Sequence, residues 1–193
     1  MMQKLLEAYE QGNIKIGDYV NYQPDYRQEV LTREETGWSK NQVVGTEKDL
    51  RYQFAGINKG KILILSDTVS SKVILQGKNG YENGPRTLQK YVEECYSSKK
   101  LNAKGVCITK EIFVELPIEI RENNYTYWLA TQCRYMCIDR VFFGVHFVLG
   151  GNVYRCGLYY SSASTNKSSN GIRPAIILPD DIQIDENNNL VYM

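Results

Sequence analysis

The chain has 193 residues, which is enough for one sizeable hydrophobic core and slightly more than one average domain requires. Hydrophobic residues make up 42% and charged residues 23%, proportions that exclude a disordered or collagen-like chain. Its 23 Lys and Arg residues offset 22 Asp and Glu residues, so no overall basic field exists to gather phosphates. We therefore expect a folded protein without a nucleic-acid partner.

The five cysteines are an odd number and include no C-x-x-C pair. A chain of this length does not need disulfides, so we expect five free thiols in a reducing cytosol. Charged residues appear at Lys4 and Glu7 before any signal-peptide apolar stretch develops. No run approaches the roughly 20 apolar residues of a membrane span, and we expect no membrane insertion.

The first third of the chain predicts a short helix, a strand, a long irregular stretch and a hairpin. The helix is indicated by Leu5, Leu6 and Tyr9 on one helical face. The hairpin is indicated by two apolar runs that flank the turn residues 58–60. In chain order these elements are a helix over 3–11, a strand over 16–22, a surface excursion over 23–49, and hairpin strands over 50–57 and 61–66.

The rest of the chain predicts one main helix followed by antiparallel strands, which gives an α+β class. The helix has apolar residues at helical spacing and Pro85 near its start. In chain order we expect a turn-rich stretch over 77–85, the main helix over 85–96, a helical turn capped by Thr109, strands over 141–149 and 153–160, a polar loop over 161–170, and a buried strand over 171–178.

Tyrosine is the unusual component, with 15 Tyr against 5 Phe and 2 Trp. A tyrosine ring gives a large rigid contact area with a polar tip, so the excess suggests display on surfaces. Edge strands and cores also use tyrosine, and for any single residue the structural role is the more common one.

Catalytic motifs are missing from the sequence. Its one histidine, His146, lies on the less apolar face of a predicted strand, where a partly exposed, non-catalytic role is expected. Cys133, Cys137, Cys156 and His146 could be drawn as a zinc set, but their spacing fits no common structural zinc class. The acidic pairs after residue 179 are typical of a solvated tail. We expect no enzyme activity, no metal and no cofactor.

Four short segments stand out along the chain: Gly17-Asp18-Tyr19-Val20-Asn21-Tyr22, Leu75-Gln76-Gly77-x-x-Gly80-Tyr81-x-Asn83-Gly84, Tyr127-Trp128-Leu129-Ala130 and Gly171-Ile172-Arg173-Pro174. Taken together in this order, they resemble a family of phage and prophage proteins of clostridia and related bacteria. The C-terminal half resembles the C-type lectin fold, as used by formylglycine-generating enzymes and by the variable proteins of diversity-generating retroelements. The resemblance implies a single C-type lectin-like domain over 1–193, with a helix, a strand and a long loop in 1–50 and a strand-rich ligand-display half in 125–178.

The resemblance also implies which residues are scaffold. Trp128 and Leu129 are expected in the core, and Pro174 is expected where a strand begins. Arg173 is expected to be a structural partner of a carboxylate or of backbone carbonyls. We expect residues 125–178 to form one antiparallel unit packed on the helix over 85–96.

Between the scaffold strands, side-chain types change abruptly while the apolar frame stays regular. In retroelement variable proteins, randomised adenines turn Asn-type codons into codons for Tyr, Ser, Cys, Arg, His, Asp and Gly. The predicted ligand-binding residues belong to that set: Tyr135, Cys137, Asp139, Arg140, His146, Tyr154, Arg155, Cys156, Tyr159 and Tyr160. We expect the tyrosines and arginines among them to be exposed on one face, with a strand bulge near Cys156 and Gly157.

Three functions remain open from the sequence. The first is a display protein that binds a protein or glycan on a cell surface, made in the bacterial cytoplasm without a signal peptide. The second is a virion protein, such as a phage tail component or homo-oligomer, with a fixed interaction surface. The third is an oxidase related to formylglycine-generating enzymes, whose copper-binding cysteine pair the cysteines of this chain do not match.

Overall fold

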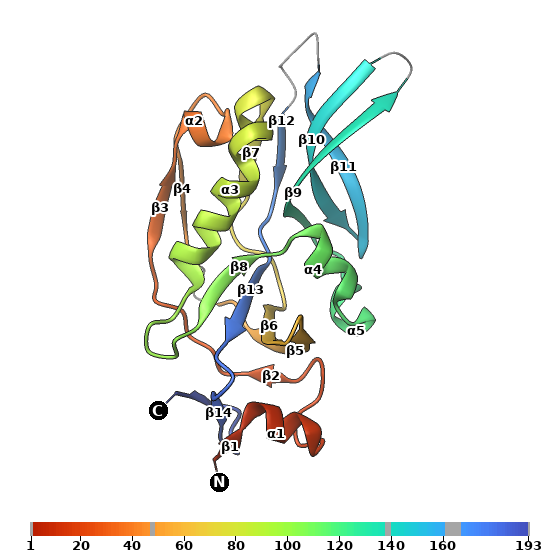
Figure 1. Ribbon diagram of the computed structural model, residues 1–193. Coiled ribbons are helices and arrows are strands. Elements are labelled where there is room, and N and C mark those ends of the chain that lie inside the picture. The colour runs from red at the N-terminus through yellow and green to blue at the C-terminus, as the bar shows by residue number, and fades with distance from the viewer. Residues whose placement is uncertain (1, 47–48, 138–139, 161–166, 193) are drawn as a thin grey trace.

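The computed structural model describes residues 2–46, 49–137, 140–160 and 167–192, without the side chains of residues 135–137, 140, 159–160 and 167–168. Its centre is an antiparallel five-stranded sheet in the order β2-β5-β6-β13-β8 (Figure 1). These strands are β2 (Tyr19–Val20), β5 (Tyr52–Asn58), β6 (Lys61–Ser66), β13 (Pro174–Leu178) and β8 (Lys104–Cys107). Helices with mostly antiparallel sheets confirm the predicted α+β class.

The predicted hairpin is formed by β5 and β6. Its two-residue turn consists of Lys59 and Gly60, both with positive φ (49° and 73°), a geometry that matches the twist of the flanking strands. β13 begins at Pro174, as expected. The strand predicted over 16–22 is shorter in the structure, where only Tyr19–Val20 pairs with β5.

Both faces of the central sheet are buried. Ile62 and Ile64 of β6 join one hydrophobic cluster with the main helix, α3 (Gly77–Tyr96). Leu63 and Leu65 join a second cluster on the opposite face, because successive residues of a strand point to opposite sides. A sheet covered on both faces gives near-continuous apolar strands, as the sequence of β6 shows.

Two short helices, α4 (Lys110–Glu115) and α5 (Ile118–Arg121), cover the second cluster. The predicted cap is confirmed, because the side-chain oxygen of Thr109 accepts a hydrogen bond from the backbone N–H of Ile112 at 3.3 Å. α5 was not predicted, since four residues are too few to show a helical period.

The main helix begins earlier than predicted. Residues 77–85, expected to be turns, form its first turns. The glycines there serve close packing: a Cβ on Gly80 would lie 2.9 Å from the carbonyl oxygen of Thr36, and one on Gly84 would lie 3.0 Å from Leu75 Cδ1. They therefore let neighbouring segments approach the helix rather than breaking it.

Pro85 lies inside α3. Proline has no backbone N–H, so the carbonyl of Tyr81 four residues earlier loses its helical donor. The side chain of Gln132, which lies in β9, supplies the missing donor through Nε2 at 2.8 Å. The interrupted helical ladder thus becomes an attachment point for the strand that carries the candidate site.

The surface excursion predicted over 23–49 contains regular structure. It holds β3 (Gln28–Leu31), α2 (Arg33–Thr36) and β4 (Gln42–Gly45), with β3 and β4 paired antiparallel. Leu31 and Val44 are buried in the first cluster. The sequence did hold a signal for α2, because Thr32 and Glu35 form a capping box.

Residues 125–178 do not form one antiparallel unit, contrary to expectation. β9 (Thr126–Cys137), β10 (Arg140–Leu149) and β11 (Asn152–Tyr160) form a separate three-stranded antiparallel sheet in the order β11-β10-β9. β12 (Lys167–Asn170), predicted as loop, pairs with β7 (Val73–Gln76), whereas β13 enters the central sheet. Packing on α3 is confirmed, because Trp128, Val145 and Leu158 share its hydrophobic cluster.

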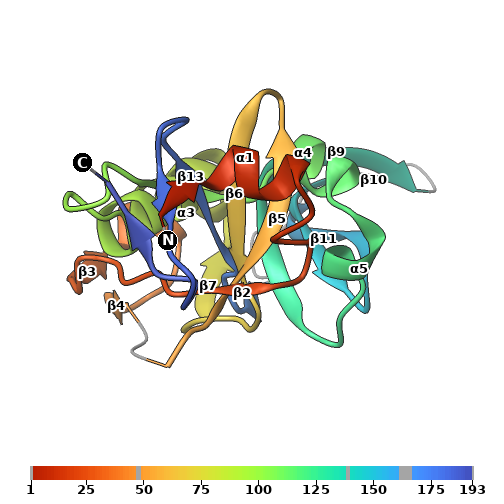
Figure 2. The ribbon, with the colours of Figure 1, turned by 90° about the horizontal axis from the view of Figure 1, so that it is seen from below.

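The two ends of the described chain meet. The predicted opening helix is present as α1 (Leu5–Glu10), which crosses one end of the central sheet (Figure 2). A small sheet joins β1 (Gln3–Lys4), β14 (Gln183–Ile184) and β15 (Leu190–Val191). None of the helices in the described part of the chain has the length and apolar character to span a bilayer.

Tyrosine contributes to the core as well as to the surface. Among the described side chains, five tyrosines are buried: Tyr22, Tyr52, Tyr91, Tyr96 and Tyr127. Three of their hydroxyls donate to backbone carbonyls: Tyr22 to that of Tyr96 at 2.6 Å, and Tyr91 and Tyr96 to that of Gly45 at 3.1 and 3.2 Å. The hydroxyls of Tyr52 and Tyr127 are buried without a hydrogen-bond partner among the described residues. The tyrosine excess therefore does not by itself indicate display.

Raising the pH above about 10 is expected to destabilise the protein steeply. Burial raises the pKa of Tyr22, Tyr91 and Tyr127 above the ordinary value of 10, whereas the same phenols ionise near pH 10 in the unfolded chain. The higher pKa in the folded state means that folding is favoured while these phenols stay neutral. Their contribution to the free energy of unfolding is complete below pH 10. It is lost as the pH rises, at up to about 1.4 kcal/mol per pH unit for each tyrosine. Urea unfolding at pH 8, 10 and 11 measures the loss, and an unchanged free energy of unfolding at pH 11 would contradict it.

Candidate functional site

The candidate site is the three-stranded sheet β11-β10-β9, which stands beside α3 and extends past the central sheet (Figure 1). Trp128 anchors β9 at its base. Its ring is fully buried, its Nε1 donates to the carbonyl of Val73 at 2.9 Å, and its backbone N–H donates to that of Gly171 at 3.0 Å. The predicted core positions of Trp128 and Leu129 are confirmed.

Arg173 is a second anchor, and its predicted structural role is confirmed. The side chain is 2% exposed. Its Nε donates to the carbonyl of Ser66 at 2.9 Å and its guanidinium donates to that of Ile120 at 2.8 Å. One guanidinium thus ties β6 of the central sheet to α5, and it also lies 5.8 Å from the ring centroid of Tyr127 in β9.

One face of the sheet is turned toward α3. Phe143 of β10 meets Tyr81 of α3 edge to face, with ring centroids 5.1 Å apart. Arg134, opposite Phe143 on β9, lies 5.3 Å from the Phe143 ring centroid. Sequence reasoning did not select these residues, because their grouping depends on strand register and on the position of α3.

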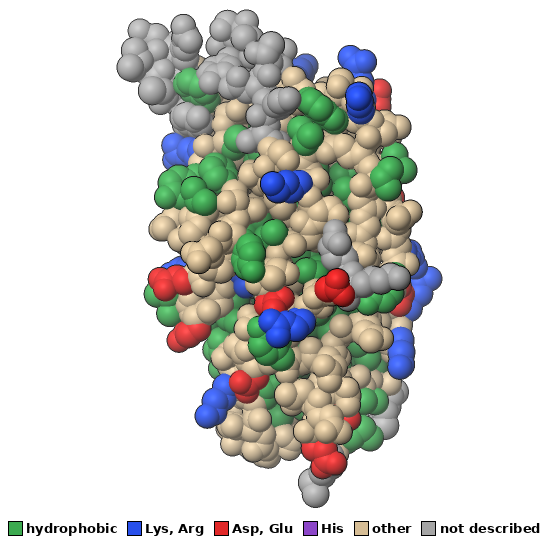
Figure 3. Space-filling view, turned by 180° about the vertical axis from the view of Figure 1, so that it is seen from behind, with side chains coloured by type: hydrophobic (Ala, Val, Ile, Leu, Met, Phe, Trp, Pro, Cys, Tyr) green, Lys and Arg blue, Asp and Glu red, His purple; other side chains and the backbone are tan. Residues whose placement is uncertain are grey.

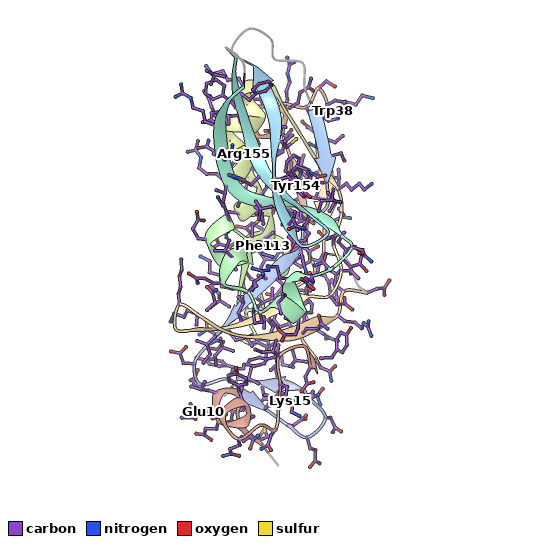
Figure 4. All side chains as sticks on the ribbon, turned by 90° about the vertical axis from the view of Figure 1, so that its right-hand side faces the viewer. Glu10, Lys15, Trp38, Phe113, Tyr154 and Arg155 are labelled. Atoms are coloured by element: carbon purple, nitrogen blue, oxygen red, sulfur yellow. The ribbon has the colours of Figure 1, made fainter. Side chains whose placement is uncertain are left out.

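Tyr154 and Arg155 lie on opposite faces of β11 and both are exposed (Figure 4). Tyr154 pairs with Phe147 across the strands, with ring centroids 5.6 Å apart. Arg155 pairs with His146 on the other face. The expectation that the predicted display residues share one face is therefore wrong, since neighbouring residues of a regular strand point in opposite directions.

The expected bulge is present in β11. Gly144 pairs with Gly157 and Phe143 pairs with Tyr159, so Leu158 is an extra residue in β11. At the same point β10 requires glycine, because a Cβ on Gly144 would overlap the carbonyl oxygen of Cys156. The bulge turns Leu158, which is fully buried, into the core.

His146 is buried rather than partly exposed, which corrects its predicted place in the ligand-binding set. It is 8% exposed and lies at a register irregularity of β9, where its Nδ1 donates to the carbonyl of Thr131 at 3.3 Å. Burial lowers its pKa, and the charge of Lys110 adds to this effect. A neutral imidazole that fills a gap in the frame is a structural residue.

The described cysteines are free thiols, as expected: Cys95, Cys107, Cys133 and Cys156. Burial raises the pKa of Cys133 to about 11 and that of Cys107 to about 12, so both are protonated at neutral pH. Cys156 is half-buried beside the core, and β10 separates β11 from β9, which carries Cys133. The geometry gives no support for Cys156 as a freely displayed residue.

Several predicted site residues fall outside what the structure describes. The side chains of Tyr135, Cys137, Arg140, Tyr159 and Tyr160 are not described, and for Asp139 neither backbone nor side chain is. Their roles stay predictions. Of the predicted ligand-binding residues with described side chains, Tyr154 and Arg155 are exposed, whereas His146 and most of Cys156 are not.

Replacing Tyr154 with alanine is expected to lower the free energy of unfolding by about 1 kcal/mol or less. Its ring is 45% exposed and contributes mainly one aromatic contact, to Phe147. Tyr91→Ala, which removes a fully buried ring, is expected to cost about 3–5 kcal/mol. Urea unfolding of both variants checks this, and equal losses would mean that Tyr154 is a core residue.

Comparison with protein-family models, with curated proteins and with solved structures finds no match for this chain. Among the described side chains, no three His, Cys, Asp or Glu residues gather closely enough to hold a metal ion. Charges of both signs are scattered over the face seen in Figure 3. The site is therefore described by its own geometry: a hydrogen-bonded three-stranded sheet with large exposed side chains on both faces.

Proposed function

We propose that this chain is a ligand-binding display protein with a C-type lectin-like fold, a variable protein of a diversity-generating retroelement. The surface that it offers is centred on β11. The side chains of Tyr154 and Arg155 point away from opposite faces of this strand. A ligand that contacts both must therefore extend around the outer edge of β11, which is an edge strand of its sheet. Tyrosine and arginine are the residue types that most often dominate binding interfaces.

One observation carries the proposal: the strands of the three-stranded sheet carry both fully buried side chains, which form the scaffold, and exposed side chains, which are available to a ligand. Trp128, Val145 and Leu158 are fully buried, while Tyr154 and Arg155 between them are exposed. Exposed residues can change without touching the packed residues, and such changes usually alter stability by no more than about 0.5 kcal/mol. A surface that is diversified by random substitution needs this separation.

The residues that attach the three-stranded sheet to the rest of the fold support the same separation between buried scaffold and exposed surface. Trp128 and the bond from Gln132 to the carbonyl of Tyr81 attach the sheet to β7 and α3. Arg173 joins β6 to α5 beside the ring of Tyr127 in β9. These attachments lie away from the exposed side chains of β11. The ligand is a protein or a glycan on a cell surface, met either by the free protein or by a virion that carries it.

Sequencing the gene and the DNA beside it in many isolates tests the proposal, by identifying the neighbouring genes and comparing the 3′ coding ends. We expect a reverse transcriptase gene, a near-copy of the 3′ end that differs at adenines, and substitutions at the codons of Tyr154 and Arg155. The codons of Trp128 and Arg173 should stay unchanged. Neighbouring tail genes alone, with an invariant 3′ end, would favour a fixed virion surface and refute diversification.

A further inference from the structure

A cleft lies near the two ends of the described chain. The loop between β2 and β3, the turn after α3 and β15 line this cleft, which has a volume of about 610 Å³. We call it the terminal cleft and define it by Asn21, Gln23, Asp25, Tyr26, Lys100 and Leu190. The volume falls within the usual range of small-molecule sites.

The terminal cleft is distinct from the candidate site. It lies at the C-terminal end of α3, beside Ser98, whereas the three-stranded sheet contacts α3 at Tyr81 near its start. With a rise of about 1.5 Å per helical residue, the two contact points are roughly 25 Å apart. In Figure 1 the turn after α3 and the C-terminal end lie away from the loop end of β10.

The lining combines an apolar floor with a polar rim. Leu101 and Leu190 are buried in the floor, while the ring of Tyr26 is 50% exposed. Amides from Asn21 and Gln23 stand at the rim with one carboxylate and one ammonium, those of Asp25 and Lys100. The two opposite charges balance, which favours an uncharged ligand over a phosphate or a carboxylate.

Polar groups of the rim are available for a ligand. Within the described part of the chain, the Tyr26 hydroxyl, the Gln23 amide and the Lys100 ammonium form no hydrogen bond or ion pair. Asn21 uses only its Nδ2, which donates to the carbonyl of Asn187 and to Asn189 Oδ1, so its own Oδ1 is free to accept. The cleft therefore offers both donors and acceptors.

The backbone that carries these groups is fixed in place. The backbone N–H of Asp25 donates to the carbonyl of Ser97 at 2.8 Å, and Asp25 Oδ2 accepts from the backbone N–H of Lys99 at 3.1 Å. The buried hydroxyl of Tyr22 donates to the carbonyl of Tyr96. A preformed site of this kind loses little conformational entropy when it binds.

We propose that the terminal cleft binds a neutral sugar of one or two pyranose residues. A pyranose has an apolar face of C–H groups that stacks on an aromatic ring, here Tyr26. Its hydroxyls both donate and accept, which matches the amides of Asn21 and Gln23 and the carboxylate of Asp25. This site does not depend on the function proposed for the three-stranded sheet.

Saturation-transfer NMR with a defined set of sugars tests the proposal. The probes are the methyl glycosides of glucose, galactose, mannose and N-acetylglucosamine, together with cellobiose, lactose and chitobiose. We expect transfer to at least one probe, with binding at least tenfold weaker in Tyr26→Ala and largely retained in Tyr26→Phe. Tyr125→Ala, which removes another exposed tyrosine, should bind as the parent does.

Three outcomes would overturn the proposal: no transfer to any probe, unchanged binding in Tyr26→Ala, or loss of binding in Arg155→Ala. If Tyr26→Ala does not fold, Gln23→Ala takes its place, because Gln23 is exposed and makes no bond that the fold needs. Loss of sugar binding in Arg155→Ala would assign the sugar to the three-stranded sheet instead. These results test sugar binding by the terminal cleft alone and leave the proposed diversification of β11 to its own test.

Discussion

Trp128→Ala is expected to lower the free energy of unfolding by about 3–5 kcal/mol, because it empties the core at the base of the candidate site. Trp128 is fully buried, and its Nε1 is the side-chain donor to the carbonyl of Val73. Trp128→Phe keeps most of the ring and leaves that carbonyl without its donor, which alone costs about 1–3 kcal/mol. Urea unfolding followed by circular dichroism measures both losses.

The other tryptophan provides the control. Trp38 is only partly buried, after α2, so Trp38→Ala should cost clearly less than Trp128→Ala. If Trp128→Ala lost less than about 1 kcal/mol, Trp128 would not be an anchor of the sheet. If Trp128→Ala does not fold, Trp128→Phe still separates the hydrogen bond from the ring.

Arg173→Met is expected to cost about 2–5 kcal/mol. The substitution keeps much of the apolar volume but removes the charged donor shared by the carbonyls of Ser66 and Ile120, and each buried carbonyl left without a partner costs about 1–3 kcal/mol. Thermal and urea unfolding measure the loss. The effect should appear as one cooperative transition, since Arg173 joins β6 to α5.

Arg51→Met is the matched control for Arg173→Met. Arg51 pairs with Asp67 at 2.8 Å, but its side chain is 67% exposed, and exposed ion pairs contribute about 1 kcal/mol or less. Equal effects of the two substitutions would show that the buried hydrogen bonds of Arg173 between β6 and α5 stabilise the fold no more than an exposed ion pair does.

Local patterns predicted the elements whose signals are short-range. The hairpin of β5 and β6 follows from apolar runs and turn residues, and the cap of α4 follows from Thr109. The early start of α3 could not be predicted in this way. Gly80 and Gly84 usually indicate turns, and only the approach of Thr36 and Leu75 explains why they lie in a helix.

The candidate site was predicted only in part, because some of its features depend on local patterns and others on long-range strand register. Alternation along β11 and the glycine at 157 were sufficient to place a bulge, and Tyr154 and Arg155 are exposed as expected. The burial of His146 depends on how β9 and β10 align, a long-range register that one strand does not encode. The terminal cleft was missed because its walls come from segments that are far apart in the sequence.

Binding of the purified, fluorescently labelled chain to intact clostridial cells, the hosts that the family resemblance implies, tests the central claim most directly. Flow cytometry over a panel of species should find at least one that binds the chain, with binding reduced at least tenfold in the Tyr154→Ala and Arg155→Ala double variant. Lys61→Ala and Lys104→Ala, both exposed on the central sheet, should bind as the parent does. Binding that is unaffected by the double variant, or absent from every species, would contradict the account.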